Sequence, residues 1–215
     1  MMLHNLSEGH SLINQFVAEL RDVSRQTDRF RFRKHIERIG EICAYEVSKA
    51  LPWKTQEITT PLGKKQMPVL AEQPVLATIL RAGLPLHHGI NNFFSDADNC
   101  FISAYRNHKA DGSFDIVVEY LAAPDLNNRI VILADPMLAT GQSVVLAYQA
   151  MLRNGTPREV HIVNLIGSKQ GVAYVQEHLP DAHIWIAAID DELDAHGYIV
   201  PGLGDAGDLS FGEKL

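Results

Sequence analysis

Residues 131–143 combine an acid with a small-residue turn between a predicted buried strand and a helix. The run reads Val-Ile-Leu-Ala-Asp-Pro-Met-Leu-Ala-Thr-Gly-Gln-Ser and leads directly into a helical pattern over residues 144–152. Unpaired backbone N–H groups in such a turn, together with the helix dipole, attract a phosphate. Asp135 at the strand end can accept hydrogen bonds from sugar hydroxyls. The segment predicts binding of a phosphorylated sugar; the alternative is an ordinary strand-to-helix turn in which Thr140 or Ser143 only caps the helix.

Two arginines lie at the ends of other predicted strands, where they could bind the same anion. Arg81 follows a strand over residues 75–80 and is itself followed by Ala-Gly-Leu, and Arg106 closes a strand over residues 100–105. A guanidinium binds phosphate oxygens through two parallel hydrogen bonds and stays charged. The alternatives are a surface arginine at position 81 and a solvated hairpin tip at position 106. We expect the polar residues 108–113 to form a mobile flap.

The C-terminal segment, residues 190–215, is dense in Gly, Asp and Pro and shows little helical or strand periodicity. It carries more apolar residues than a disordered tail normally has. We therefore expect an ordered loop that covers a site. Within it, residues 196–208 read His-Gly-Tyr-Ile-Val-Pro-Gly-Leu-Gly-Asp-Ala-Gly-Asp, and glycine-rich backbone can present donors and acceptors to the edge of a flat ring.

These segments, in this order, resemble the uracil phosphoribosyltransferase family of type I phosphoribosyltransferases. The resemblance runs from about Thr27 to the C-terminus. It rests on the stretches at residues 78–84, 104–107, 135–141 and 196–208. It implies that pyrophosphate is displaced from phosphoribosyl pyrophosphate (PRPP) by N1 of uracil, giving uridine monophosphate (UMP). The alternatives are a non-catalytic regulator that senses pyrimidine nucleotides on the same fold, and a phosphoribosyltransferase for another nucleobase.

The resemblance also implies a role for individual residues. The residues implied in catalysis are Asp205, Arg106 and Asp135. Those implied in PRPP binding are Arg81, Arg106, Asp135, Pro136, Met137, Leu138, Ala139, Thr140, Gly141, Gln142, Ser143 and Asp205. Those implied in holding uracil, largely through the main chain, are Ile199, Gly204, Asp205 and Ala206.

The resemblance further implies that Mg²⁺ arrives on substrate oxygens and water, without a dedicated set of protein ligands. Some members of the family respond to GTP, which makes GTP a candidate effector. Three positions depart from the family pattern: Gln142 replaces a glycine, residues 167–171 read Gly-Ser-Lys-Gln-Gly, and Leu209 replaces a basic residue. Gln142 would be strained at positive φ but harmless in a first helical turn, and we expect the latter because the helical pattern begins at once.

The elements that must position these residues follow a regular order. Helical spacing covers residues 11–26 and 28–51, and a polar hairpin is expected over residues 55–60 and 64–70. Strands are predicted at residues 75–80, 100–105, 130–134, 159–166 and 183–189, and helices at residues 84–94, 144–152 and 170–178. This alternation predicts an α/β fold in which an open, mainly parallel, twisted sheet is flanked by helices. N-terminal helices and the hairpin form an appendage over residues 1–70 that we expect to support a homodimer or homotetramer.

Composition narrows the class of protein. The 215 residues are 46% hydrophobic, enough for one large domain over residues 1–215. The net charge of −7 argues against nucleic acid and anionic membranes as partners. Cys43 and Cys100 lie in apolar patterns typical of buried filler. With no apolar run of membrane-spanning length and no signal-like N-terminus, we expect a cytoplasmic protein.

Overall fold

The computed structural model describes residues 2–108 and 114–213, with the side chains of residues 104–118 outside that description. The helices are α1 (Leu12–Arg21), α2 (Arg29–Ser48), α3 (Leu84–Phe93), α4 (Gln142–Met151), α5 (Lys169–His178) and α6 (Ala206–Phe211), with a short 3₁₀ turn at Leu152–Asn154. The strands are β1 (Met2–Asn5), β2 (Trp53–Thr60), β3 (Gly63–Leu70), β4 (Val75–Leu80), β5 (Asp98–His108), β6 (Phe114–Ala122), β7 (Ile130–Ala134), β8 (Met137–Leu138), β9 (Glu159–Ser168), β10 (His183–Asp190), β11 (Glu192–Leu193) and β12 (Ile199–Val200).

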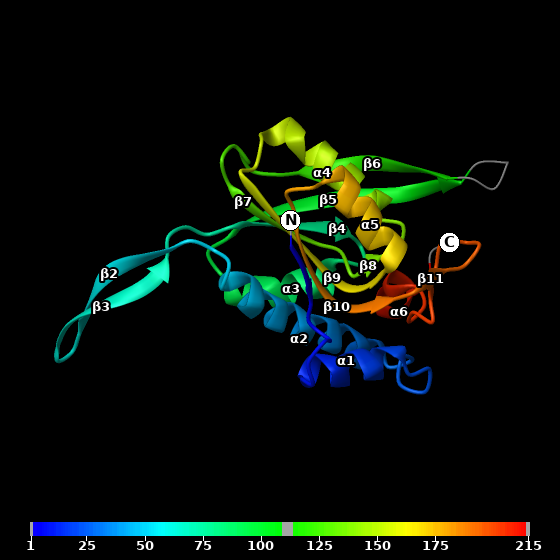
Figure 1. Ribbon diagram of the computed structural model, residues 1–215, viewed down its shortest axis with the longest axis horizontal. Helices are drawn as coiled ribbons and strands as arrows, with labels where there is room; N and C mark the ends of the chain where they lie inside the picture. Colours follow the sequence, from blue (N-terminus) through cyan, green and yellow to red (C-terminus); the bar gives the residue numbers. More distant parts are fainter. Residues whose placement is uncertain (1, 109–113, 214–215) are drawn as a thin grey trace.

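One large sheet dominates the molecule (Figure 1). Its strand order is β1-β10-β9-β7-β4-β5-β6, and the short β8 pairs with β9. All of these pairings are parallel except β5 with β6, which is antiparallel. Because the parallel strands all run the same way, their carboxyl ends meet at one edge of the sheet. The predicted open, mainly parallel α/β architecture is confirmed.

Helices cover the two faces of the sheet and enclose two cores. On one face α1, α2 and α3 pack onto the sheet, and on the other face lie α4 and α5 (Figure 1). The first core includes Phe32, Ile36 and Ile90, and the second includes Val144 and Val175. Since both faces of the central strands are covered, β7 is buried along its whole length.

The two N-terminal helices form as predicted, but both end earlier: α2 stops at Ser48, three residues short of the predicted end, and α1 stops five residues short. Ser11 caps α1 in a capping box with Asn14, and the Asp28 side chain caps α2 by accepting a hydrogen bond from Arg31 N. The prediction carried α1 to residue 26, but the helix ends at Arg21. There the Asp22 side chain accepts hydrogen bonds from the Ser24 amide and hydroxyl, which compete with helix continuation.

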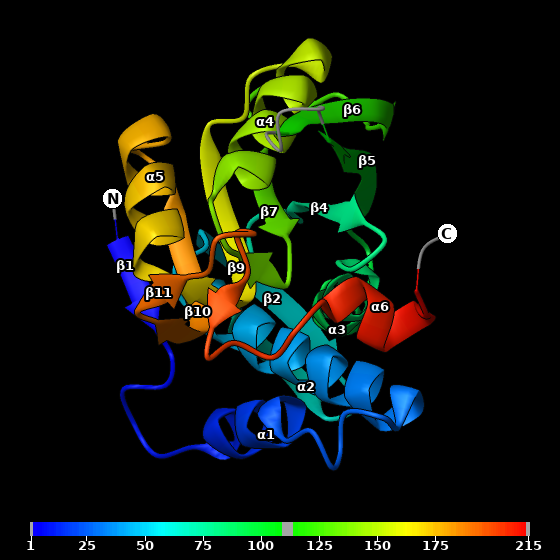
Figure 2. The ribbon, with the colours of Figure 1, turned by 90° about the vertical axis from the view of Figure 1, so that its right-hand side faces the viewer.

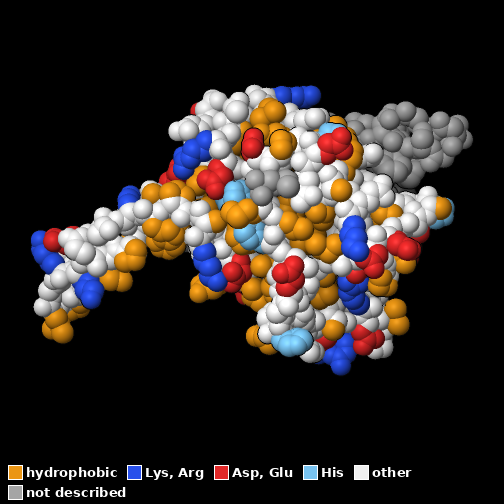
Figure 3. Space-filling model, viewed as in Figure 1, with side chains coloured by type: hydrophobic (Ala, Val, Ile, Leu, Met, Phe, Trp, Pro, Cys, Tyr) orange, Lys and Arg blue, Asp and Glu red, His pale blue; other side chains and the backbone are white. Residues whose placement is uncertain are grey.

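The predicted hairpin, β2 with β3, projects from the body as an arm (Figure 1). Apolar side chains are exposed along it, with Leu62 at its tip fully exposed and Trp53 and Met67 partly so. Figure 3 shows hydrophobic side chains along the arm, interspersed with charged ones, and charged side chains scattered over the rest of this face. Among the described residues, no helix combines the length and the apolar character that a membrane crossing requires.

Three strands of the main sheet were not predicted: β1, β6 and the two-residue β8. β1 contributes four residues at one edge of the sheet, too few for a periodic pattern. β6 runs antiparallel beside β5 at the other edge, so it falls outside the alternation of strands and helices that guided the prediction. The predicted flap at residues 108–113 lies outside the described residues, except for the backbone of His108 at the end of β5.

Candidate active site at the carboxyl edge of the sheet

The predicted site residues follow the carboxyl ends of neighbouring strands. β4 lies beside β7, with Thr78 opposite Ala134, and β7 lies beside β9, with Ala134 opposite Val163. Figure 2 views this edge end-on, with the C-terminal chain crossing it toward α6. Ligands of open parallel sheets collect at this edge, beyond the strands.

The phosphate loop, defined here as residues 135–141, connects β7 to α4. Asp135 is 7% exposed, and β8 within the loop pairs with β9. Gly141 has φ +79°, a left-handed conformation that glycine adopts without strain, and it precedes α4 with no side-chain cap. Gln142 is the first residue of α4, so the prediction that it occupies the first helical turn is confirmed. Gln142 N donates a long, 3.4 Å hydrogen bond to the Thr140 hydroxyl, and the next N–H groups of α4 have no side-chain cap among the described residues, so they are presented at the edge of the sheet.

Residues 167–171, which depart from the family pattern, pack against the phosphate loop. The Ser168 hydroxyl donates a 2.6 Å hydrogen bond to the carbonyl of Ala139 and accepts one of 2.8 Å from Gly171 N. A side chain at Gly171 would collide with the Leu138 and Ala139 carbonyls, so close packing requires glycine there. Ser168 is a contributor that sequence reasoning missed, although its position as the N-cap of α5 could have indicated it.

Asn164 supports the beginning of the phosphate loop from β9. Its side-chain amide donates a 2.6 Å hydrogen bond to the carbonyl of Asp135, and both residues are buried. The backbone of β9 also binds the loop, because Leu165 N and Ile166 N both donate to the carbonyl of Pro136. The loop is thus fixed from one side by the strand next to it.

Arg81 lies in the turn between β4 and α3, where it connects two parts of the site. Its Nη2 donates 2.6 Å and 2.7 Å hydrogen bonds to the Asp208 carboxylate and the Gly212 carbonyl. Its Nε is buried and has no hydrogen-bond partner among the described residues. A Cβ at Gly83 would lie 2.7 Å from the Ile79 carbonyl and 3.0 Å from that of Ala134, so the turn needs a small residue there, as the sequence suggested.

Arg106 could be placed only by its backbone. It lies in β5, next to β4, and pairs with Ile116 of β6. Its side chain is outside the described part of the structure. The role implied for Arg106 therefore stays a prediction.

The C-terminal segment contains more regular structure than the loop that was predicted. β11 and β12 form a small antiparallel pair around a turn in which His196 N and Tyr198 N both donate to the Asp194 carboxylate. After β12 the chain forms α6. The prediction of an irregular loop is wrong in this respect, because strands of two residues and a helix of six are too short to produce periodicity.

The base segment, defined here as residues 199–206, contains all the residues implied in holding uracil. Ile199 and Ala206 are buried, and Gly204 has φ +93°. Asp205 caps α6, with one carboxylate oxygen accepting hydrogen bonds from Gly207 N at 2.8 Å and Asp208 N at 3.0 Å. The carboxylate is held in a fixed orientation at the start of the helix.

The phosphate loop and the base segment border the same turn between β4 and α3. On one side, Gly83 lies against the Ala134 carbonyl, the residue before the phosphate loop. On the other side, a Cβ at Gly207 would lie 3.6 Å from the Ala82 Cβ and 3.9 Å from the Arg81 Nε. Residues that directly flank the two segments, Ala134 and Gly207, thus lie against one turn at the carboxyl edge, and the structure does not separate the segments onto opposite faces of the molecule.

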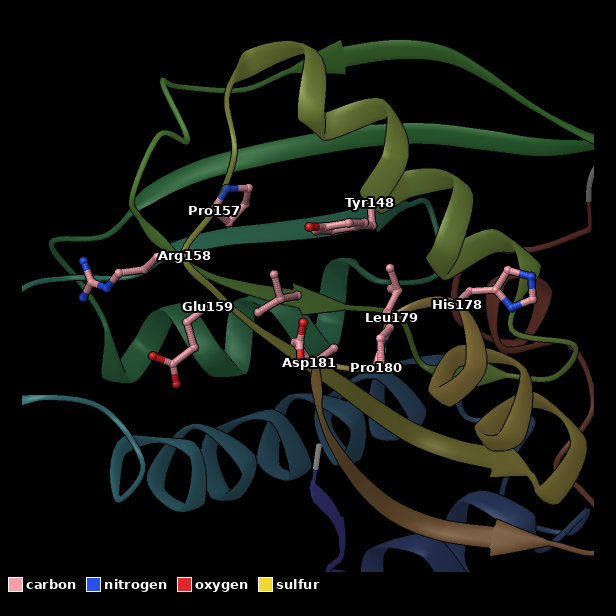
Figure 4. A pocket seen from close by; sticks show the side chains of 10 residues that line it. Tyr148, Pro157, Arg158, Glu159, His178, Leu179, Pro180 and Asp181 are labelled. Carbon is pink, nitrogen blue, oxygen red and sulfur yellow. The ribbon is translucent and has the colours of Figure 1, made fainter.

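A cavity of about 270 Å³ lies elsewhere, near the amino ends of β9 and β10 (Figure 4). Tyr148 of α4, His178 of α5 and the Leu179–Ala182 connection line it, together with residues at the start of β9. None of the predicted site residues contributes to this cavity. It belongs to the opposite end of the sheet.

The sequence and the fold of the chain are similar to those of known proteins. The family model described as uracil phosphoribosyltransferase matches residues 7–213. A uracil phosphoribosyltransferase of Porphyromonas gingivalis is 53% identical over 216 residues, which covers 100% of this chain and 100% of the relative. The structure of the AQ2163 protein from Aquifex aeolicus superposes with a TM-score of 0.87 at 30% identity, covering 98% of each chain. A hypoxanthine phosphoribosyltransferase from Staphylococcus aureus has a TM-score of 0.51 at 13% identity, with 86% of this chain and 84% of that chain covered, and this likeness bears on the fold alone.

Proposed function

The chain belongs to the uracil phosphoribosyltransferase family, and we propose that it transfers the phosphoribosyl group of PRPP to N1 of uracil, releasing pyrophosphate and UMP. It is an enzyme of the glycosyltransferase type. One structural observation carries the proposal beyond family membership. The residue before the phosphate loop and the residues just after the base segment border the turn that holds Arg81, and this arrangement supports one site for both substrates.

The chemistry requires opposite charges at the two ends of the breaking bond. Negative charge grows on the leaving pyrophosphate, and positive character grows on the sugar carbon. We assign Arg81 and Arg106 to the pyrophosphate, because guanidinium groups bind its oxygens in pairs. We assign Asp135 and Asp205 to the ribose, where a carboxylate stabilises developing positive charge. No covalent nucleophile is needed.

The backbone performs the remaining binding in this proposal. The N–H groups of the phosphate loop and of the first turn of α4, including those of Gln142 and Ser143, hold the 5′-phosphate. Thr140 lies beside them and can donate its hydroxyl. The main chain of Ile199, Gly204 and Ala206 pairs with the edge of uracil. A main-chain site of this kind selects a base by its donors and acceptors.

Mg²⁺ fits this site as an ion carried by the substrate. Among the residues that the structure describes, no group of three or more His, Cys, Asp and Glu side chains could hold a metal ion. The Asp135 and Asp205 carboxylates are oxygen donors of the kind that Mg²⁺ takes one or two at a time, with substrate and water completing its shell. Bound to the diphosphate, Mg²⁺ would neutralise charge on the leaving group.

The test is direct conversion by the purified protein. Radiolabelled uracil, PRPP and Mg²⁺ should yield labelled UMP, and omission of PRPP should abolish the product. Labelled nucleotide formed only when another nucleobase replaces uracil would overturn the base assignment. Tight binding of UMP without any turnover would overturn the enzymatic assignment and identify a pyrimidine-sensing regulator.

We also propose that the N-terminal appendage joins subunits. The exposed apolar side chains of the arm, Trp53, Leu62 and Met67, support this assignment. Sedimentation should reveal a dimer or tetramer, and a monomer would contradict it. GTP as an effector and the cytoplasmic location stay predictions, and addition of GTP to the conversion assay tests the first.

A further inference from the structure

The base segment is held in place by residues from the opposite end of the chain. After β12 the chain passes over α2 on its way to α6 (Figure 2). There it meets the end of α1 and the turn between α1 and α2. Two side chains from this region, Arg21 and Gln26, donate hydrogen bonds to its backbone.

Arg21 and Asp190 together fix both peptide groups of Gly202. Arg21 donates a 2.7 Å hydrogen bond to each carboxylate oxygen of Asp190, which is the last residue of β10. The same guanidinium donates to the Gly202 carbonyl at 3.0 Å, and Asp190 accepts from Gly202 N at 2.9 Å. Gly202 itself has φ +58°, and a side chain there would collide with the Ile199 carbonyl. The pair therefore holds a tight turn that only glycine can form.

Gln26 fixes the next residue. Its amide nitrogen donates 2.7 Å hydrogen bonds to the carbonyls of Leu203 and Leu20, so it ties the base segment to the end of α1. Leu203 is buried against the same core as Ile199 and Ala206. Residues 202 and 203 are thus anchored between Ile199 on one side and Gly204 on the other.

The ion pair is built to persist at neutral pH. Burial is the largest single influence on the pKa of Asp190 and by itself would raise it, because burial opposes the charged form. The hydrogen bonds from Arg21 and from Gly202 N, with the positive charge of Arg21, outweigh burial and lower the pKa of Asp190 below its usual value. The carboxylate stays ionised and keeps both of its partners.

We propose that Arg21, Asp190 and Gln26 are positioning residues for uracil, because they fix the backbone whose peptide groups hold the base while leaving the phosphate loop untouched. The inference rests on the proposed function. It gives the N-terminal helices a role in base affinity in addition to any role in subunit association. None of these three residues belongs to the motifs that carry the family resemblance.

The experiment compares two variants with a matched control. Arg21→Lys keeps the positive charge but loses the guanidinium fork, and Gln26→Ala removes the bridge to Leu203. Gln15→Ala on α1 serves as the control, because the hydrogen bond of the Gln15 side chain among the described residues goes to Glu19 and not to the base segment. We expect KM for uracil to rise about fivefold in the first two variants. Each variant loses hydrogen bonding to the base segment, and the net contribution of one hydrogen bond corresponds to about a fivefold change in affinity. KM for PRPP should stay within about twofold, and the control should match the wild type.

The outcomes separate this proposal from the one it rests on. If the wild-type protein forms no UMP, the proposed function fails first. If the wild type is active and both variants keep the wild-type KM for uracil, the positioning role is overturned. A parallel rise of both KM values, or a lower melting temperature alone, would also overturn it, because a merely structural contact affects both substrates alike. If Arg21→Lys does not fold, Gln26→Ala alone decides.

Discussion

The phosphate loop and the base segment lie at the same edge of the sheet but are held in different ways. The phosphate loop continues directly from β7 into α4, and its bonds to Asn164 and Ser168 span only 29 positions of the chain. The base segment is held by Arg21 and Gln26, 181 and 177 positions away from the carbonyls that they bind. One half of the site is local in the sequence, and the other half depends on the packing of the N-terminal helices.

This difference predicts that the two substrates can be affected separately. The phosphate loop depends on β9 and the start of α5, whereas the base segment depends on the end of α1. A change in one support should alter the affinity for one substrate and spare the other. Arg81 lies between the two, because it follows β4 and binds Asp208 and Gly212 of the C-terminal segment.

The largest effect should come from Asp205, which we assign to the ribose. Asp205→Asn keeps a side-chain oxygen that can accept from Gly207 N and Asp208 N, but it removes the negative charge. We expect kcat to fall on the order of 100-fold, because the charge no longer stabilises positive character on the sugar. Steady-state kinetics measures the change.

The matched control is Asp28→Asn, which alters the N-cap of α2 in the same way at a residue that we assign to neither substrate. Its kcat should match that of the wild type. Near-normal turnover by Asp205→Asn, with an unchanged circular dichroism spectrum, would remove Asp205 from the mechanism.

The sequence was sufficient for the fold because the central strands are both buried and regular. β7 reads as a continuous apolar run, β9 is mostly apolar and almost wholly buried, and the alternation with helices implied parallel pairing. β6 was not predicted because an antiparallel edge strand does not fit that alternation. β1 was not predicted because four residues are too few to show a periodic pattern. Hydrophobic periodicity reveals the parts of a sheet that bury a repeating face.

The candidate site, like the sheet, contains a part that the sequence predicts and a part that it does not. The phosphate loop could be located from its own residues, and Gln142 could be placed in the first turn of α4 because the helical pattern starts beside it. The contact between Ser168 and Ala139 and the pair Arg21 with Asp190 could not be inferred, because hydrogen bonds between distant segments leave no local pattern. The implied roles of individual residues still await experiment.

The stability of the sheet that supports both regions should depend on pH through His161. This side chain is fully buried in β9, and burial, followed by the charges of His183 and His4, lowers its pKa to about 3. Trp185 donates to its Nδ1, so its Nε2 carries the proton toward Glu159. Between pH 6.5 and about pH 3, the His161 imidazole is protonated in the unfolded chain but neutral in the folded chain. Stability should therefore fall as the pH drops from 6.5 toward 3, by about 2 kcal/mol at pH 5.

Urea unfolding at pH 8 and pH 5 measures this loss for the wild type and for His161→Gln. The variant should lose less stability between the two pH values by about that amount. At pH 8 its KM values for uracil and PRPP should both match those of the wild type, because β9 begins at the opposite edge from the site. An identical loss in both proteins would show that His161 does not cause the acid sensitivity.

Arg81→Ala should weaken the binding of PRPP more than the binding of uracil. Loss of the guanidinium removes charge-assisted hydrogen bonds to pyrophosphate, so we expect KM for PRPP to rise about tenfold and KM for uracil to rise less. Because Arg81 also binds Asp208, the comparison needs Asp208→Asn, which breaks that ion pair and leaves Arg81 in place. Asp208→Asn should not raise KM for PRPP. Equal increases for both substrates in Arg81→Ala would argue against a pyrophosphate contact.

Ser168→Ala should give the smallest effect and the sharpest contrast with Arg21→Lys. It removes the hydrogen bond to the Ala139 carbonyl, worth about 1 kcal/mol, together with the N-cap bond from Gly171 N, and loosens the phosphate loop without touching the base segment. We expect about a fivefold rise in KM for PRPP and an unchanged KM for uracil. Ser48→Ala, which removes a similar bond to the Tyr45 carbonyl on the exposed end of α2, is the control. If Ser168→Ala and Arg21→Lys shifted the same KM, the two halves of the site would share one support, and the division drawn between them would be wrong.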